Sequence, residues 1–322
     1  MTDRDPSLGR DVPPAPGEER EPAPTAPQLA AWPILELERD GATAGDIHAS
    51  SAPDWPPTSA LVALIAALAT GIIGGTLVAV ILGALLGVNA TGATLAPGLV
   101  ITATAVQDAA FVGTALEVAR RGGRRLRPEQ FGLRTTGFWH ALGLIFILYI
   151  SFLVVTVAWQ GVFNDHTPEK LLDQLGANEN ASLLVASAVL TCVIAPFCEE
   201  FLFRGYIFTA LRNWRGPWPA ALITGLMFGG VHVLSAPIID LLPLAFLGFG
   251  LCLLYWRTGS LLPGIATHSI NNSFAFAALE SWPSRDYLLL AAAALGVLGL
   301  IGAGLRSRNL IVGRPRSGLA AG

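Results

Sequence analysis

The segment APFCEEFLFRGYIF, residues 195–208, decides how the rest of this chain must be interpreted. It lies inside a long apolar run, about 182–211, yet it contains Glu199, Glu200 and Arg204. A charged residue inside a membrane helix costs at least about 2.5–3.5 kcal/mol on insertion scales, so it normally faces the protein interior and marks function. The segment therefore predicts a membrane helix that carries a functional polar site.

The composition of the whole chain agrees with a membrane protein. Of the 322 residues, 52% are hydrophobic and 13% are charged, whereas soluble domains average about 25% charged residues. Eight apolar runs are each near or above the roughly 20 residues that a helix needs to cross the hydrocarbon core. They span about 59–87, 94–119, 138–160, 182–211, 218–235, 238–256, 261–280 and 286–305. We therefore predict an all-α polytopic membrane protein with about eight transmembrane helices and an intramembrane polar cavity.

The chain divides into three parts by composition. Residues 1–57 are acidic and hold half of the 22 prolines, which predicts a disordered tail. Residues 58–306 form the predicted membrane domain, with its motifs in 180–280, and residues 307–322 form a short basic tail. Arginines concentrate in alternate loops, so the positive-inside bias places both tails in the cytoplasm. The Ala, Gly and Arg content favours a bacterial cell membrane, and no broad basic surface indicates nucleic acid.

Two adjacent carboxylates in the opening segment have different helical neighbours. Glu200 and Arg204 are four residues apart, so they share a helix face and can form an ion pair. Glu199 is rotated from Glu200 by about 100° and need not join that pair. Two interpretations follow. Either Glu200 and Arg204 form a purely structural ion pair, or Glu200 neutralises Arg204 and leaves Glu199 available for catalysis.

Two later runs carry further polar residues. His232 lies in the run 218–235, and His268 and Asn272 lie four apart in the run 261–280, where Ser269 is expected to point elsewhere. Each group alone is explained by helix packing or by a polar clamp between helices. Together with Glu199 they require a common polar interior. Their simplest shared use is to activate a water molecule, with the carboxylate as general base and the histidines as orienting or oxyanion-stabilising groups.

The motifs E-E-x-x-x-R, F-x-x-x-H and H-x-x-x-N, on successive apolar runs, resemble the CPBP family (CAAX proteases and bacteriocin-processing enzymes), also called the Abi or type II CAAX prenyl endopeptidase-like family. The resemblance covers about 180–280, roughly a third of the chain. The matching positions are Glu199, Glu200, Arg204, Phe228, His232, His268 and Asn272.

The resemblance implies a hydrolase, an intramembrane endopeptidase that cuts near the membrane face. Glu199 would activate the water and His232 would assist it. His268 and Asn272 would hold the oxyanion. The remaining motif residues, Glu200, Arg204 and Phe228, would support the site.

The cofactor and the substrate stay open at this point. Family members are commonly labelled metalloproteases, and Glu199, His232 and His268 have the ligand types of a three-ligand zinc site. The same residues can also run a glutamate–water mechanism without metal. The expected partners are the bilayer and a peptide or protein substrate, either a lipidated C-terminal CAAX sequence or a peptide precursor. A transporter or channel with a buried Glu/His relay and a catalytically silent scaffold are the alternatives.

Overall fold

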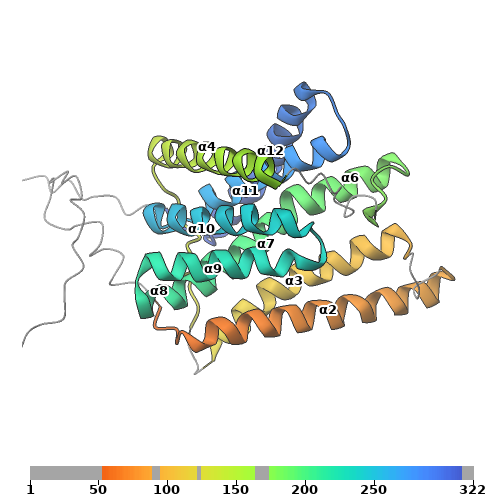
Figure 1. The fold of residues 1–322 in the computed structure, drawn as a ribbon. Helices are drawn as coiled ribbons and strands as arrows, with labels where there is room; N and C mark the ends of the chain where they lie inside the picture. The colour runs from red at the N-terminus through yellow and green to blue at the C-terminus, as the bar shows by residue number, and fades with distance from the viewer. Residues whose placement is uncertain (1–52, 89–94, 122–124, 164–173, 314–322) are drawn as a thin grey trace, which may run out of the picture. The chain divides into compact units, whose positions relative to one another are not determined.

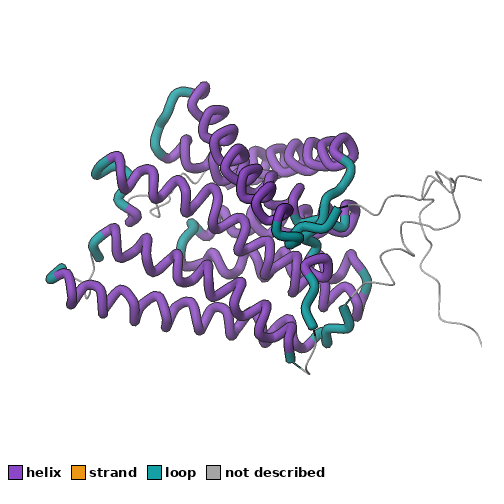
Figure 2. The backbone as a smooth tube through the Cα atoms, turned by 180° about the vertical axis from the view of Figure 1, so that it is seen from behind, coloured by secondary structure: helices purple, strands orange, loops and turns teal. Residues whose placement is uncertain are grey.

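The structure is a computed structural model that describes residues 53–88, 95–121, 125–163 and 174–313. The predicted N-terminal tail lies outside the described residues except for 53–57, and most of the predicted basic tail, 314–322, lies outside them too. Within the described ranges the regular structure is helical apart from one isolated bridge between Arg134 and Val312 (Figure 2). The predicted all-α class is confirmed.

Each of the eight apolar runs contains a helix (Figure 1). Seven runs form single α-helices: α2 (Thr58–Leu86), α3 (Pro97–Arg120), α4 (Phe138–Phe163), α9 (Pro217–Val231), α10 (Leu241–Thr258), α11 (Leu262–Leu279) and α12 (Ser284–Ser307). The fourth run forms one continuous composite helix from α6 (Ala181–Val189), the π-helix η2 (Leu190–Ile194), α7 (Ala195–Glu200), the π-helix η3 (Phe201–Phe208) and α8 (Thr209–Arg215). Short 3-10 turns are η1 (Pro128–Phe131), η4 (His232–Leu234) and η5 (Ile238–Asp240).

Fewer helices qualify as membrane spans than the sequence predicts. Within the described residues, six helices are long and apolar enough to cross a bilayer, not eight. Helix α9 has 15 residues, about five short of a full crossing. Helix α11 has 18 residues, but its His, Asn and Ser side chains lower its hydropathy. Both helices carry predicted site residues, so the two helices that do not qualify as membrane spans are ones that carry polar site groups.

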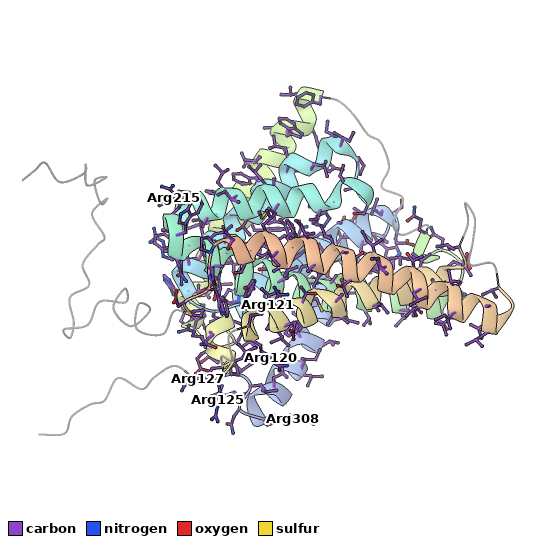
Figure 3. All side chains as sticks on the ribbon, turned by 90° about the horizontal axis from the view of Figure 1, so that it is seen from below. Arg120, Arg121, Arg125, Arg127, Arg215 and Arg308 are labelled. Carbon is purple, nitrogen blue, oxygen red and sulfur yellow. The ribbon has the colours of Figure 1, made fainter. Side chains whose placement is uncertain are left out.

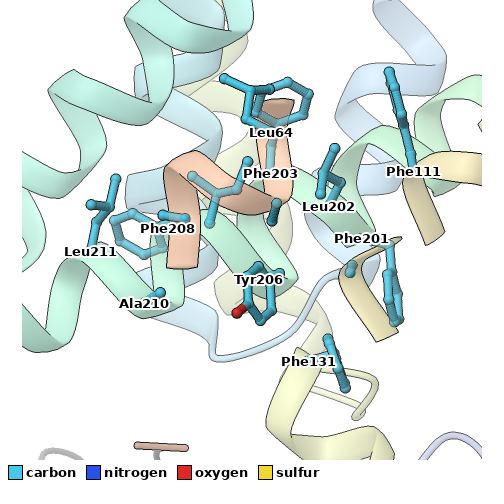
Figure 4. Close-up of a cluster of buried hydrophobic side chains, with 14 of the residues drawn as sticks. Leu64, Phe111, Phe131, Phe201, Leu202, Phe203, Tyr206, Phe208, Ala210 and Leu211 are labelled. Carbon is cyan, nitrogen blue, oxygen red and sulfur yellow. The ribbon is translucent and has the colours of Figure 1, made fainter. Parts of the chain in front are cut away.

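The composite helix packs against α2, α3, α9, α10 and α11, with its α6–η2 part also meeting α12 (Figure 1). Every residue of its η3 segment, 201–208, is buried. A helix that buries its whole circumference lies in the interior of a protein rather than facing lipid. Figure 4 shows aromatic and aliphatic side chains from several elements gathered around this segment. The charged segment identified in the sequence therefore lies at the centre of the helix packing.

One end of the helices carries a group of arginines. The labelled arginines, Arg120, Arg121, Arg125, Arg127, Arg215 and Arg308, lie toward the same end in Figure 3. At this end the chain is tied together by backbone hydrogen bonds, in which Leu261 donates to the Gly132 carbonyl at 2.9 Å and Val312 donates to the Leu133 carbonyl at 3.1 Å. Gly259, at φ 61°, ends α10 in the left-handed region and so separates α10 from α11.

Candidate active site

Glu200 and Arg204 form the ion pair that their spacing predicts. The Arg204 Nη1 donates to Glu200 Oε1 at 2.7 Å, and both side chains are fully buried. The Arg204 Nη2 also donates to the Gly248 carbonyl on α10 at 3.0 Å. One guanidinium nitrogen thus bonds the carboxylate on its own helix and the other bonds the backbone of α10. The pair therefore fixes the composite helix against α10.

His268 of α11 joins both glutamates. Its Nδ1 lies 3.1 Å from Glu200 Oε1, the oxygen that also accepts from Arg204. Because a carboxylate held by an arginine can only accept, His268 Nδ1 must carry the proton of this hydrogen bond. The other ring nitrogen, Nε2, then faces Glu199 Oε2 at 3.8 Å. Glu200 thus orients the imidazole, and the imidazole presents its second nitrogen to Glu199.

A glycine on α11 makes this approach of Glu200 possible. A Cβ atom added at Gly264 would lie 2.8 Å from Glu200 Oε2. Gly264 and His268 are four residues apart, so one face of α11 supplies both the gap and the imidazole. Glu199, by contrast, takes no part in the arginine pair, although the Oε2 atoms of both glutamates are buried without a hydrogen-bond partner. The two neighbouring carboxylates therefore differ in their surroundings, as the sequence predicts.

Phe228 of α9 is the centre of the aromatic and cationic contacts. Its ring is fully buried and lies 4.5 Å from the Arg204 guanidinium carbon, within cation–π distance. The same ring contacts the imidazoles of His232, at a centroid distance of 4.9 Å, and of His268, at 5.5 Å. Phe228 therefore connects the two histidines and covers the buried ion pair.

Small residues bring α9 and α10 close enough to form this arrangement. A Cβ added at Gly225 or Gly229 would lie within 2.8 Å of the α10 backbone carbonyls of Ala245 or Leu241. Gly225 and Gly229 are four residues apart and make a close helix crossing of the small-x-x-x-small type. Of the two glycines that precede His232, only Gly229 makes this approach, since a Cβ at Gly230 would meet open space.

His232 lies at the end of α9 and begins the 3-10 turn η4. Its Nδ1 is 2.7 Å from the Phe228 carbonyl. A carbonyl only accepts, so Nδ1 is protonated and Nε2 holds the lone pair that can accept a proton. The bond also satisfies a carbonyl at the C-terminal end of a helix, which histidines commonly do. His232 therefore joins the cluster through Phe228.

Asn272 and Ser269 both bond to the backbone of η2. The Asn272 Nδ2 donates to the Thr191 carbonyl at 2.9 Å, and the Ser269 Oγ donates to the Cys192 carbonyl at 2.6 Å. One amide hydrogen of Asn272 is thus occupied by backbone. Ser269, which the sequence placed outside the site, is fully buried and belongs to the same contact between α11 and η2.

Asp108 of α3 is a further buried carboxylate beside the cluster. It is 2% exposed, and its Oδ2 has no hydrogen-bond partner. Helix α3, which carries it, packs against α7, which carries Glu199. A third carboxyl group is therefore buried on a helix that contacts the candidate site.

The arrangement does not form the zinc site for which Glu199, His232 and His268 were candidates. Across the described ranges, no three or more His, Cys, Asp or Glu side chains are grouped so that they could hold a metal ion. The contacts instead pair Glu199 with His268 and place His232 on the Phe228 carbonyl.

An apolar cavity of about 440 Å³ lies beside the composite helix. It is lined by residues of α7, α11 and α12, among them Phe197, Ile265 and Gly302, with Arg306 and Thr135 as its polar residues. This cavity is not the polar one that the sequence predicts, and the polar cavity stays a prediction. Phe197, which lines it, lies two residues before Glu199 on the composite helix.

The cluster was only partly visible in the sequence. The structure brings together Glu199, Glu200, Arg204, Phe228 and His268, with His232 attached through Phe228. Asn272 bonds to backbone one turn further along α11. Sequence reasoning missed the roles of Gly264 and Ser269. The available signals were a glycine four residues before His268 and a proline inside an apolar helical run.

Comparison with known proteins identifies part of this chain. Residues 181–274 match the family described as "Type II CAAX prenyl endopeptidase Rce1-like". A stretch of 100 residues is 33% identical to the "Putative membrane peptidase YdiL" of Bacillus subtilis (strain 168), covering 31% of this chain and 39% of that protein. No solved structure matches the chain significantly. The matched region holds the composite helix, α9, α10 and α11 up to the end of the third motif.

Proposed function

We propose that this multi-pass membrane protein, whose residues 181–274 belong to the Rce1-like type II CAAX prenyl endopeptidase family, is an intramembrane endopeptidase in which Glu199 activates a water molecule. The proposal rests on one observation, that two adjacent carboxylates have different contacts. Glu200 is neutralised by Arg204 at 2.7 Å, whereas Glu199 is left facing His268 Nε2 at 3.8 Å. A carboxylate that acts as a general base must be free of an ion pair and must lie within hydrogen-bond reach of the water whose proton it takes.

The chemistry follows from these positions. Glu199 takes a proton from water as the water oxygen attacks the peptide carbonyl carbon. When the tetrahedral intermediate collapses, the C–N bond breaks and the protonated Glu199 returns the proton to the leaving amine. His268, held by Glu200, positions the water through its Nε2, and His232, whose Nε2 lone pair can accept a proton, assists Glu199. The second amide hydrogen of Asn272 is the donor that we assign to the carbonyl oxygen.

The membrane orientation and the substrate complete the proposal. We place the arginine-bearing end of the helices in the cytoplasm, following the positive-inside rule (Figure 3). Both chain ends would then be cytoplasmic. The family description and the apolar cavity beside Phe197 support a substrate with a lipidated C-terminal sequence of the CAAX type. A peptide precursor is the alternative substrate.

His268→Ala is expected to remove the activity. The replacement deletes the group that orients the water, and we expect the cleavage rate to fall by at least about 100-fold. The measurement is cleavage, in proteoliposomes, of a farnesylated CAAX peptide and of the same sequence attached to a transmembrane anchor. The matched control is His140→Ala, an exposed histidine on α4, which should cleave at the unaltered rate. Failure of the folded unaltered protein to cut either peptide would contradict the proposed function.

Filling the apolar cavity should affect lipidated substrates alone. Gly302 lines the cavity, and a side chain there would enter open space. We expect Gly302→Leu to raise KM for the farnesylated peptide at least about threefold and to leave the unmodified, membrane-anchored peptide unaffected. Gly304 lies on the same helix, has equally open surroundings and does not line the cavity. Equal effects of Gly302→Leu and Gly304→Leu would rule out this use of the cavity.

A further inference from the structure

We propose that Ser269 is a positioning residue that, together with Asn272, holds the π-helical segment η2 in the register that aims Glu199 at His268. The proposal rests on the proposed function for its catalytic consequence. Its structural basis is the hydrogen bond from Ser269 Oγ to the Cys192 carbonyl at 2.6 Å, between α11 and the composite helix.

Pro196 is the reason that η2 needs partners from another helix. An ordinary residue at 196 would donate its N–H to the Cys192 carbonyl in an α-helix, four residues back, or to the Thr191 carbonyl in a π-helix, five residues back. Proline has no N–H, and its ring crowds the carbonyl four residues before it. The preceding residue, Ala195, does donate five residues back, to the Leu190 carbonyl.

Helix α11 supplies a donor to each of these two carbonyls. Ser269 bonds to the Cys192 carbonyl and Asn272 bonds to the Thr191 carbonyl, at 2.9 Å, so the carbonyl that an N–H at residue 196 would bind has a partner on α11 in either helical register. A proline inside a membrane helix is tolerated where neighbouring helices satisfy the freed backbone groups. A hydrogen bond between two membrane helices is common, but the two acceptors here are the carbonyls four and five residues before the proline.

The position of the clamp gives it a catalytic consequence. Ser269 follows His268 directly, while Pro196 precedes Glu199 by three residues. The same part of α11 therefore holds η2, which leads directly into α7, and carries the imidazole that faces Glu199. His268 Nδ1 also binds Glu200 Oε1. The composite helix and α11 are therefore joined at two places, at η2 through Ser269 and Asn272 and at α7 through His268. Loss of one point allows α7 to shift, and shifts of about 1 Å can lower rates by about 100-fold.

A double-mutant cycle tests whether Ser269 acts through the proline. The four proteins are the unaltered chain, Ser269→Ala, Pro196→Ala and the double variant, each purified in the same micelles and reconstituted for cleavage of the farnesylated CAAX peptide. We expect Ser269→Ala to lower kcat at least about tenfold with KM unchanged, and to lower Tm by about 2–4 °C because a buried carbonyl loses its partner. In the Pro196→Ala background, where residue 196 has an N–H, Ser269→Ala should change kcat less than twofold and Tm by less than half as much.

Thr267→Val is the matched control. Thr267 precedes His268, is fully buried and donates to the Pro263 carbonyl of its own helix at 2.8 Å. Its removal should leave kcat within about twofold of the unaltered value. Equal losses for Ser269→Ala in both backgrounds would overturn the proposal, as would a loss for Thr267→Val as large as that for Ser269→Ala. The Tm cycle needs no substrate, so it still tests the clamp if the unaltered protein cuts neither peptide and the proposed function fails.

Discussion

Glu199→Gln is expected to abolish peptide cleavage while the protein stays folded. The amide has the shape of the carboxylate but cannot take a proton from water, so we expect kcat to fall about 1,000-fold. Stability should change little, since Glu199 takes no part in the Arg204 ion pair and its Oε2 has no hydrogen-bond partner to lose. The measurements are cleavage of the two peptides in proteoliposomes and Tm in micelles.

The matched control for this result is Glu117→Gln. Glu117 is an exposed carboxylate on α3, and its replacement removes the same charge without touching the cluster. We expect unaltered cleavage. If Glu199→Gln cleaved at more than about a tenth of the unaltered rate, Glu199 would not be the general base. The assignment of the working carboxylate would then be wrong even if the chain is a peptidase.

Arg204→Met is expected to produce the largest loss of stability in the molecule. It leaves Glu200 ionised and fully buried with no cation beside it, and breaking a buried pair in this way costs about 3–5 kcal/mol. The same replacement also removes the hydrogen bond to the Gly248 carbonyl and the contact with the Phe228 ring. We expect a lower unfolding free energy in micelles, and loss of cleavage as a consequence.

Two further variants separate charge from packing in this result. In Glu200→Gln/Arg204→Met neither charge of this pair is left buried, and the glutamine can still accept from His268 Nδ1, so we expect at least half of the lost stability to return. Arg215→Met, an exposed arginine at the end of α8, should have little effect. A double variant as unstable as Arg204→Met alone would show that packing around the guanidinium, rather than charge pairing, stabilises this region.

Local spacing in the sequence was sufficient for the Glu200–Arg204 pair. Residues four apart on a helix are neighbours whatever surrounds the helix, so the pair and the separate position of Glu199 could both be predicted. The eight apolar runs were likewise readable, because bilayer thickness sets a length scale that hydropathy reports. The prediction of eight full spans was too high, since α9 ends at Val231, and α11 carries the polar site residues.

The partners of these residues could not be read in the same way. Nothing in the spacing of Glu200 and His268, which are 68 residues apart, indicates that the imidazole binds the carboxylate oxygen that Arg204 holds. The family resemblance implied an oxyanion role for Asn272, but nothing in the sequence indicated that its amide donates to the Thr191 carbonyl, five residues before Pro196. The π-helical segments escape prediction because insertion of one residue in a turn leaves hydropathy unchanged.

What the sequence by itself determined is the set of charged and polar groups and the helices that carry them, because a charge inside an apolar run is costly and helical neighbours lie three or four residues apart. What only the tertiary structure decided is which nitrogen faces which oxygen. Those contacts depend on close helix approach, as at Gly264 against Glu200 and at Gly229 against α10, and on the hydrogen bonds from α11 to the backbone of η2. Packing between helices is set by the whole fold, so no local pattern contains it.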